Sequence, residues 1–273
     1  MDIFIAQACS GACKLERLKD TAQWRGDGGI LDPRGKVALL TGGARIGHVV
    51  ALQLAARGCA LALTYRNSLA AARETAAAVR AAGVAATTIH ADATDEAQIK
   101  AAVSEAASTM GRLDILINLA SGYERTPNPT MADWSGALDA NARSAFLFAI
   151  HAAPIMKSAG AGRIVNFSDW LPRSGRPHYK GYTPYYTSKA AVAALTESLA
   201  FDFAPEILVN AIAPGPILAP PDITAAENAQ VLKNTPLNRW GGADEIAKAV
   251  LFLIETEFVT GECIRVDGGR HLN

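Results

Sequence analysis

The chain has 273 residues, with 26 basic and 26 acidic side chains and a formal net charge of zero. This balance argues against nucleic acid or an anionic membrane surface as the main partner. Half of the residues are hydrophobic and only 19% are charged, which argues against disorder and suggests that other subunits cover part of the surface.

The four cysteines predict neither a disulfide framework nor a metal site. Cys9 and Cys13 are close together but have no His or Cys partners nearby, and Cys59 and Cys263 occur in apolar contexts typical of small core residues. The amino terminus has too short an apolar run for a secretory signal, and no apolar run approaches the ~18 residues of a membrane span. We therefore expect a cytoplasmic protein without a bound metal.

Residues 1–34 carry mixed charge, turn-rich glycines and no sustained periodicity, which predicts an N-terminal extension ahead of a single domain at 35–273. In that domain, short apolar runs alternate with helical patterns. Strands are expected at 37–40, 61–65, 85–89, 115–117, 163–167, 207–212 and 263–266. Helices are expected at 46–56, 68–82, 95–110, 131–158, 184–203 and 244–254.

Continuous apolar strands that alternate with helices indicate an α/β protein, with a parallel sheet of about seven strands covered on both faces. The long helix at 131–158 is expected to kink at Pro154. Residues 218–240 have the pattern of a mobile, partly helical lid. In such a sheet the ligand site lies beyond the carboxyl ends of the strands, so residues at these ends are the first candidates for function.

The first strand ends in a glycine-rich turn, Thr-Gly-Gly-Ala-Arg-Ile-Gly at 41–47, that leads into a helix. Glycines at Gly42 and Gly47 let the backbone turn tightly and approach a pyrophosphate at the helix N-terminus. Alone, the same pattern is compatible with an ordinary tight turn.

The second strand ends in Tyr65, Arg66 and Asn67, without the acidic residue that would bind an adenosine 2′-hydroxyl. Arg66 suits a 2′-phosphate instead, and Arg45 would add a second positive charge. A solvated surface arginine is the alternative for Arg66. Asp92 follows the third strand, where its carboxylate either accepts from an adenine amino group or caps the next helix.

Tyr185 and Lys189 lie four residues apart on one predicted helix face. A free tyrosine has a pKa of about 10, and a cation one turn away is expected to lower the pKa of Tyr185. By spacing alone the two residues are also compatible with an ordinary amphipathic pair.

Taken together, these residues resemble the short-chain dehydrogenase/reductase family over about residues 35–273. The motifs that carry the resemblance, in chain order, are Thr41-Gly42 with Gly47, Asp92, Asn118-Leu119-Ala120, Asn141, Tyr185 with Lys189, Asn210, Pro214-Gly215-Pro216 and Val266-Asp267-Gly268-Gly269.

The resemblance implies a Rossmann-type fold and a role for each matching residue. Tyr185 would be the proton donor, and Lys189 would hold the nicotinamide ribose and lower the tyrosine pKa. Asn141 would hold a water of the proton relay, and Asn118 would stabilise the backbone beside the cofactor. The motifs and the resemblance together predict cofactor contacts at Gly42, Arg45, Ile46, Gly47, Tyr65, Arg66, Asn67, Asp92, Asn118, Ala120, Ser121, Lys189, Pro214, Gly215 and Ile217.

The sequence departs from the family pattern in three places. The glycine turn is one residue shorter than usual, and Gly47 is its only later glycine. Leu119 and Ser121 replace an asparagine and a glycine after the fourth strand. The position of the catalytic serine is ambiguous between Ser168 and Asp169, and the loop that leads to Tyr185 is long.

These departures resemble the pteridine reductase subgroup. Its members carry an arginine in the turn, as Arg45 does here, and an aspartate in place of the catalytic serine, which matches Asp169 with Ser168 as the alternative. Tyr123 and Trp170 are the expected lining of a slot for a flat heterocycle. A packing aromatic under a loop is the alternative for Tyr123.

We therefore expect an NADPH-dependent reductase that acts on a C=O or C=N bond of a small substrate of the pteridine type. A 3-oxoacyl-[acyl-carrier-protein] reductase is the enzymatic alternative, and a cofactor-binding regulatory protein without turnover is the alternative of another class. Apolar stretches on the helices at 131–158 and 184–203, with the family resemblance, predict a homotetramer.

Overall fold

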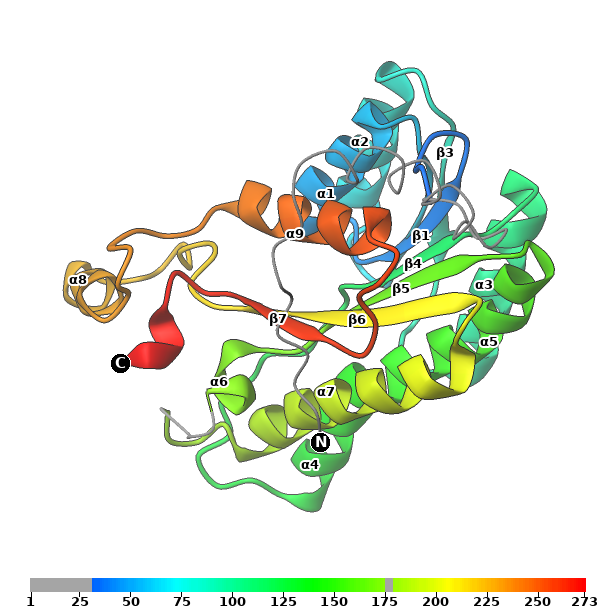
Figure 1. The fold of residues 1–273 in the computed structure, drawn as a ribbon. Helices are drawn as coiled ribbons and strands as arrows, with labels where there is room; N and C mark the ends of the chain where they lie inside the picture. Colours follow the sequence, from blue (N-terminus) through cyan, green and yellow to red (C-terminus); the bar gives the residue numbers. More distant parts are fainter. Residues whose placement is uncertain (1–30, 175–178) are drawn as a thin grey trace, which may run out of the picture.

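The computed structural model describes residues 31–174 and 179–273. They form a seven-stranded parallel sheet in the order β3-β2-β1-β4-β5-β6-β7 (Figure 1). The expected α/β class, strand number and strand direction are confirmed. The strands are β1 Val37–Thr41, β2 Ala60–Tyr65, β3 Ala86–His90, β4 Ile115–Asn118, β5 Gly162–Phe167, β6 Ile207–Pro214 and β7 Cys263–Val266.

Helices cover both faces of this sheet (Figure 1). The α1, α2 and α9 helices lie on one face, and α3, α5 and α7 on the other. The helices of the described residues are α1 Ile46–Ala56, α2 Leu69–Ala81, α3 Glu96–Met110, α4 Met131–Leu138, α5 Ser144–Ser158, α6 Trp170–Arg173, α7 Thr183–Phe203, α8 Ala225–Lys233 and α9 Ala243–Glu255, with the π-helical η2 Asp139–Arg143 and the 3₁₀ segment η3 Arg270–Leu272.

The central strands β1 and β4 are apolar at all but their last position, because each of their two faces packs against a helical layer. In β4, Ile115 and Ile117 belong to the core under α1 and α9, whereas Leu116 belongs to the core under α3, α5 and α7. Side chains alternate between the faces of a strand, so a strand in this place needs a continuous apolar run. This burial explains why short apolar runs in the sequence locate the strands.

The segment expected as one helix at 131–158 is divided into α4, η2 and α5. The departure from α-helical geometry lies at Asp139–Arg143, whereas Pro154 lies within α5. A π-helical turn accommodates an extra residue and reorients the side chains around it. Here it carries Asn141, one of the candidate site residues.

The carboxyl edge of the sheet is covered by segments that follow β5, β6 and β7. The short helix α6, which the sequence did not predict, follows β5, and α8 lies in the expected partly helical lid after β6 (Figure 1). Thr224 and Glu227 form a capping box that starts α8. These segments lie beside η3 at the end of the chain, so three parts of the sequence enclose this edge.

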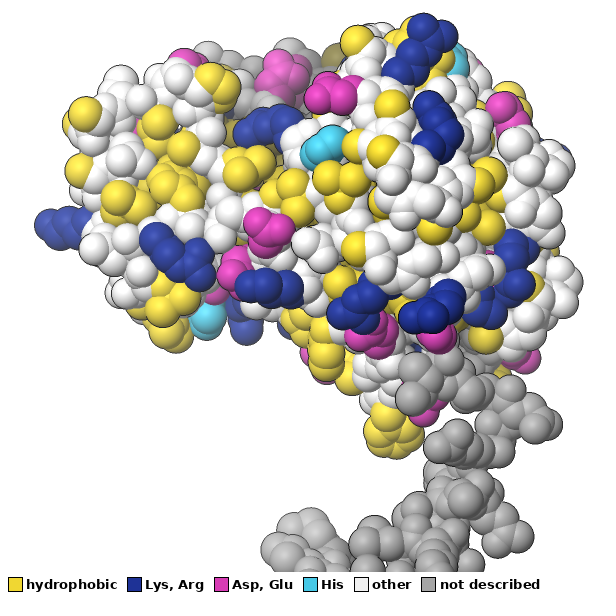
Figure 2. All heavy atoms as spheres, turned by 90° about the horizontal axis from the view of Figure 1, so that it is seen from above, with side chains coloured by type: hydrophobic (Ala, Val, Ile, Leu, Met, Phe, Trp, Pro, Cys, Tyr) yellow, Lys and Arg dark blue, Asp and Glu magenta, His cyan; other side chains and the backbone are white. Residues whose placement is uncertain are grey.

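Figure 2 views the molecule from above the face that carries α1, α2 and α9 and shows basic and acidic side chains close to one another. Across the described residues, no helix combines the length and the apolar character that crossing a membrane requires. Nor do the described residues bring together three or more His, Cys, Asp or Glu side chains that could hold a metal ion. Of the expected extension 1–34, residues 1–30 with Cys9 and Cys13 lie outside the described residues, whereas Leu31 is buried in the core, so the division at residue 34 stays a prediction.

A buried carboxylate joins β1 to β4 at the amino edge of the sheet, opposite the candidate site. Asp114 is 1% exposed and accepts hydrogen bonds from the Val37 amide at 2.9 Å and from the Arg112 guanidinium at 2.8 and 2.6 Å. Lys36 lies 3.8 Å from the same carboxylate. Since ionised acceptors form stronger hydrogen bonds than neutral ones, this group contributes more to stability than an exposed ion pair does.

We expect Asp114→Asn to lower the free energy of unfolding by ~1.5–3 kcal/mol, because it removes the charge from a buried acceptor of several donors. Glu206→Gln is the matched control, since Glu206 pairs with Lys157 at 4.0 Å on the surface and should cost less than ~1 kcal/mol. Urea denaturation at neutral pH measures both. Equal losses in the two variants would contradict the role given to Asp114.

Candidate functional site

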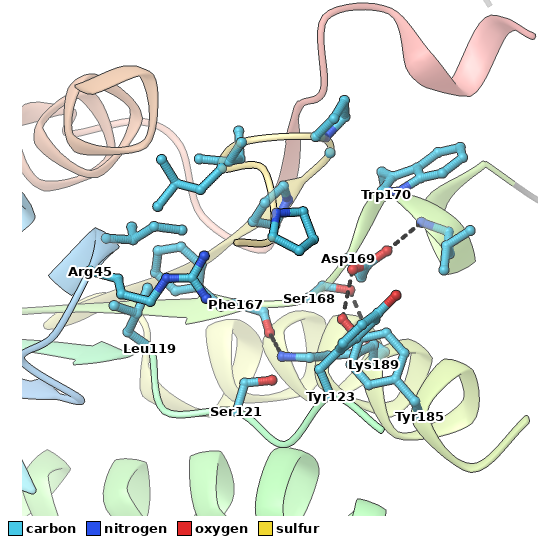
Figure 3. Close-up of a pocket in the computed structure, with 18 of the residues that line it drawn as sticks. Arg45, Leu119, Ser121, Tyr123, Phe167, Ser168, Asp169, Trp170, Tyr185 and Lys189 are labelled. Carbon is cyan, nitrogen blue, oxygen red and sulfur yellow. Dashed lines mark hydrogen bonds between the residues drawn. The ribbon is translucent and has the colours of Figure 1, made fainter. Parts of the chain in front are cut away.

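A cavity of about 710 Å³ lies at the carboxyl edge of the sheet (Figure 3). Its walls come from the turn after β1, the segment after β4, the end of β5 with α6, the start of α7, the segment after β6 and η3. The order of the strands reverses between β1 and β4. Ligands of doubly wound sheets bind at this kind of switch point, so the cavity is the candidate site.

Tyr185, Lys189 and Asp169 come together in this cavity (Figure 3). The Tyr185 hydroxyl donates to Oδ2 of Asp169 at 2.6 Å, and Nζ of Lys189 donates to the Phe167 carbonyl at 2.7 Å. Both α7 side chains are buried. Tyr185 and Lys189 are therefore not an ordinary amphipathic pair, because both point into the site.

The structure distinguishes the two candidates after β5. The Ser168 hydroxyl donates to the Lys189 carbonyl at 2.8 Å and so bonds to the backbone of α7. Asp169 bonds Tyr185 through one carboxylate oxygen and accepts from the Leu171 amide through the other, at 2.8 Å, which caps α6. The group that contacts the phenol of Tyr185 is therefore Asp169.

Burial shifts the pKa values of all three groups. It raises the pKa of Asp169 above its usual range, against the hydrogen bond from Tyr185. Burial, with the neighbouring Asp169 carboxylate, raises the pKa of Tyr185, so the net shift is opposite to the expected lowering. The part that Lys189 and a bound nicotinamide contribute to this pKa stays a prediction. Burial lowers the pKa of Lys189 to about 8. At neutral pH Tyr185 thus retains its proton, as a proton donor must.

Asn141 links the segment after β4 to α7. Its side-chain amide donates to Ser188 Oγ at 2.8 Å and to the Gly122 carbonyl at 3.1 Å, and its oxygen accepts from Ser121 Oγ at 2.9 Å. No hydrogen bond is present between Asn141 and Tyr185 or Lys189 in the described residues. Its position on η2 fits a positioning role, and its expected role in holding a water stays a prediction.

The turn after β1 has the geometry of a pyrophosphate site. A Cβ on Gly47 would lie 2.1 Å from the Gly42 carbonyl oxygen, so only glycine fits. Arg45 has a positive φ of 51°, and its side chain extends into the cavity (Figure 3). No side chain caps the N-terminus of α1, which begins at Ile46. The Gly47 amide donates to the Ala44 carbonyl at 2.9 Å. The positive end of the helix still favours an anion, and these residues fit a dinucleotide despite the shortened turn.

The residues expected at the adenosine end lie after β2 and β3. The Tyr65 ring contacts His90 edge-on, and Arg66 pairs with Asp92 at 3.8 Å. Asp92 also accepts from the amide and hydroxyl of Thr94, which lowers its pKa. The next helix is capped by Asp95, which removes helix capping as the explanation for Asp92. Asn67 follows Arg66 directly, and none of these residues lines the cavity described above.

Most of the residues expected around the nicotinamide line the cavity, but Asn118 does not. Nine of the expected cofactor residues line the cavity, namely Gly42, Arg45, Ile46, Ala120, Ser121, Lys189, Pro214, Gly215 and Ile217. Asn118 is instead buried, and its amide donates to Asn166 at 2.9 Å and to the Ala145 carbonyl at 3.3 Å. Its side chain therefore joins β4 to β5 and α5 in the core, and any effect on a cofactor acts through the backbone.

Aromatic rings line the side of the cavity where the sequence analysis expects the substrate. Tyr123 stacks on Tyr182 with ring centroids 5.2 Å apart and contacts Tyr185 edge-on at 4.8 Å. With an exposed fraction of 62%, Tyr123 is not an aromatic packed under a loop. Trp170 lies on the side opposite Arg45 (Figure 3). Both expected substrate residues therefore line the site.

Sequence reasoning missed Tyr179, Tyr182 and Arg270, which also line the cavity. Tyr182 lies three residues before Tyr185, and this helical spacing could have identified it. Arg270 follows Gly269 at the end of the chain, and no local pattern connects it to the site.

Comparison with known proteins gives concordant results. The family model described as enoyl-(acyl carrier protein) reductase matches residues 43–271. The chain is 36% identical over 249 residues to the 3-oxoacyl-[acyl-carrier-protein] reductase FabG of Staphylococcus aureus, covering 87% of this chain and 98% of that protein.

Solved structures agree. A short-chain dehydrogenase/reductase from Serratia marcescens superposes with a TM-score of 0.81 at 33% identity, over 88% of this chain and 99% of that one. The NADPH-dependent 3-quinuclidinone reductase from Rhodotorula rubra superposes with a TM-score of 0.83 at 28% identity, over 89% and 94%. The chain is therefore an oxidoreductase that belongs to the short-chain dehydrogenase/reductase family.

Proposed function

We propose that this enzyme uses NADPH to reduce a C=O or C=N bond in a small planar heterocycle of the pteridine type. The observation that carries the proposal is the 2.6 Å hydrogen bond from Tyr185 to Asp169. Burial raises the pKa of Asp169, so its carboxyl keeps a proton to higher pH than an exposed aspartate does, and the protonated form can deliver that proton to a ring nitrogen.

The chain's own residues supply positioning and proton transfer. When bound, the cofactor supplies the hydride that adds to the substrate carbon. Tyr185 and Asp169 hold the proton that the substrate heteroatom takes up, so a C=N bond becomes CH–NH with one hydride and one proton. Lys189, fixed by the Phe167 carbonyl, presents its ammonium group beside the Tyr185 ring, 6.0 Å from its centroid.

The aromatic wall supports a flat substrate. Tyr123 and Tyr182 present stacked rings beside Tyr185, and aromatic faces favour offset stacking on a planar heterocycle. A flexible acyl chain has no planar ring and would not stack on these aromatic faces.

Reduction of a 3-oxoacyl thioester is the second candidate, because the Staphylococcus aureus relative at 36% identity bears that name. A shared framework does not determine the substrate, however. The two candidates differ in what they require of Asp169, since a ketone oxygen needs only the proton of Tyr185. Substitution of Asp169 therefore separates them.

The preference for NADPH rests on charge. Arg66 follows β2 and has only Asp92 as an ionic partner within the described residues. A 2′-phosphate carries more negative charge than the Asp92 carboxylate and would displace it from a partner that is exposed and able to turn. Arg45 supplies a second cation, in the turn after β1.

We further propose that the enzyme acts as a cytoplasmic homotetramer. Phe146 on α5 and Phe201 on α7 are exposed apolar side chains, and such faces are typical of subunit interfaces. Cys59 and Cys263 are free and buried, which is compatible with a reducing compartment.

Tyr185→Phe tests the assignment of the proton donor. The substitution retains the ring and removes the hydroxyl, so turnover should fall by ~10²-fold or more, whereas NADPH affinity should be retained. Steady-state kinetics and fluorescence titration of NADPH measure the two quantities. Turnover equal to that of the wild type would refute the assignment.

Asp169→Ser tests the proposed substrate class. In the wild type, reduction of a dihydropterin should fall as pH rises through the raised pKa of Asp169, because only the protonated carboxyl donates. The variant should flatten this pH profile and lose more activity on a dihydropterin than on a simple ketone. The measurement is kcat/KM from pH 5 to 9.

Ser168→Ala is the matched control, since its hydroxyl bonds the backbone of α7 and leaves the phenol of Tyr185 to Asp169. Its pH profile should keep the wild-type shape. If Ser168→Ala abolishes turnover and Asp169→Ser does not, Ser168 is the catalytic residue and the pteridine proposal fails.

Arg66→Ala tests the cofactor preference. Removal of one charge-assisted contact should weaken NADPH binding by ~1.5–3 kcal/mol and leave NADH binding nearly unchanged. Arg57→Ala, beyond the opposite end of α1, controls for the change in net charge. The decisive measurement is the ratio of the two dissociation constants, and a ratio near one in the wild type would exclude the preference.

A further inference from the structure

Arg270 brings a buried cation to the substrate side of the cavity. It is the first residue of η3, it lines the cavity, and only 7% of it is exposed. Its guanidinium lies over the ring of Trp170, 5.5 Å from the centroid. Nη2 donates to the Tyr179 hydroxyl at 3.1 Å, and Nη1 donates to the Val231 carbonyl at 3.4 Å. Neutral groups from α6, α8 and the loop before α7 therefore hold this side chain in place.

This cation has no carboxylate within ion-pairing distance among the residues that the structure describes. A guanidinium carries five N–H donors, and only two of them have the partners named above. Burial of an unpaired charge is costly. An anion that enters the cavity would compensate this cost.

The other charged groups of the cavity already have partners or face another part of it. Lys189 donates to the Phe167 carbonyl, and Asp169 accepts from Tyr185 and Leu171. Arg45 extends from the turn at the N-terminus of α1, where a cofactor pyrophosphate fits, and Trp170 lies on the opposite side (Figure 3). Because Arg270 stacks on Trp170, it is not placed to serve the same phosphates.

We propose that Arg270 binds a carboxylate of the substrate, so that the substrate is a planar heterocycle with a carboxylate-bearing substituent. This proposal rests on the proposed function and specifies its substrate class. The planar fork of an arginine matches the two oxygens of a carboxylate, and stacking on an aromatic ring fixes its orientation in advance.

The aromatic rings connect Arg270 to the reacting end of the cavity. Tyr179, which accepts from Arg270, lies 6.2 Å from Tyr182, and Tyr182 lies 6.4 Å from Tyr185, each measured between ring centroids. A substrate ring beside Tyr185 could therefore extend an aryl substituent along this row toward Arg270. The row fits a rigid, aromatic tail that ends in an acid.

Two matched pairs of probes test the proposal by calorimetry on the full chain saturated with NADP⁺. Folic acid and 6-hydroxymethylpterin share the pterin ring and differ in the carboxylate-bearing tail. The second pair, 2-naphthoate and 2-naphthamide, has nearly the same shape, differs in charge and in one hydrogen-bonding group, and requires no pterin recognition. Arg270→Gln should weaken binding of the two carboxylates by about tenfold or more and change binding of the two neutral probes by less than about twofold.

Two further variants separate charge from packing. Arg270→Lys retains the cation and should recover part of the carboxylate affinity. Arg239→Gln removes a cation from outside the cavity, beside Glu245, and should bind all four probes as the wild type does. If Arg270→Gln weakens the neutral probes as much as the carboxylates, Arg270 only packs the wall, and the proposal is overturned.

The two pairs also separate this proposal from the proposed function. If neither pterin binds but 2-naphthoate depends on Arg270, the carboxylate site stands and the pteridine assignment fails. If both pterins bind equally well to the wild type and to Arg270→Gln, the pteridine assignment stands and the carboxylate site fails. Failure of the wild type to bind either carboxylate also overturns the proposal.

Discussion

Two reciprocal hydrogen bonds join the end of β5 to α7, the helix that carries Tyr185 and Lys189. Lys189 donates from its side chain to the Phe167 carbonyl, and Ser168 donates from its hydroxyl to the Lys189 carbonyl. Together they fix α7 against the end of the strand. Because Ser168 is used in this contact, the next residue, Asp169, is the one that meets Tyr185. The departure from the usual serine is thus a consequence of how the strand ends.

The electrostatic properties of the site follow from the same packing. Burial raises the pKa of Asp169 and Tyr185 and lowers that of Lys189. All three shifts disfavour charge, which is the expected effect of desolvation. A bound cofactor and substrate would further exclude water, so the balance between the carboxyl, the phenol and the ammonium depends on their mutual hydrogen bonds. We therefore regard the three groups as one titrating unit rather than as separate acids and bases.

The fold was predictable from the sequence because burial on both faces leaves a strong pattern. β4 is apolar up to its last residue, Asn118, and such a run is typical of a strand that is buried on both faces. The glycine turn and the Tyr185–Lys189 spacing were predictable for a similar reason, since local geometry demands these residues. The π-helical turn at Asp139–Arg143 was not predictable, because the partners of Asn141 within it, Gly122 and Ser188, lie in other segments of the chain.

The position of Arg270 in the cavity could not be predicted from the sequence. It lies 85 positions after Tyr185 in the sequence, and only the closure of η3 over α6 brings it to the cavity. The residues next to it in the sequence do not distinguish it from an ordinary surface arginine. The same holds for the walls of the site. The glycine turn, Tyr185 and Lys189 follow the pattern shared with the relatives, whereas the segments after β5, β6 and β7 supply walls that this pattern does not include. These segments carry Trp170, α8 and Arg270, which contact one another although they are far apart in the sequence. Similarity to a reductase of acyl thioesters therefore constrains the chemistry of this enzyme more strongly than it constrains the shape and charge of its substrate.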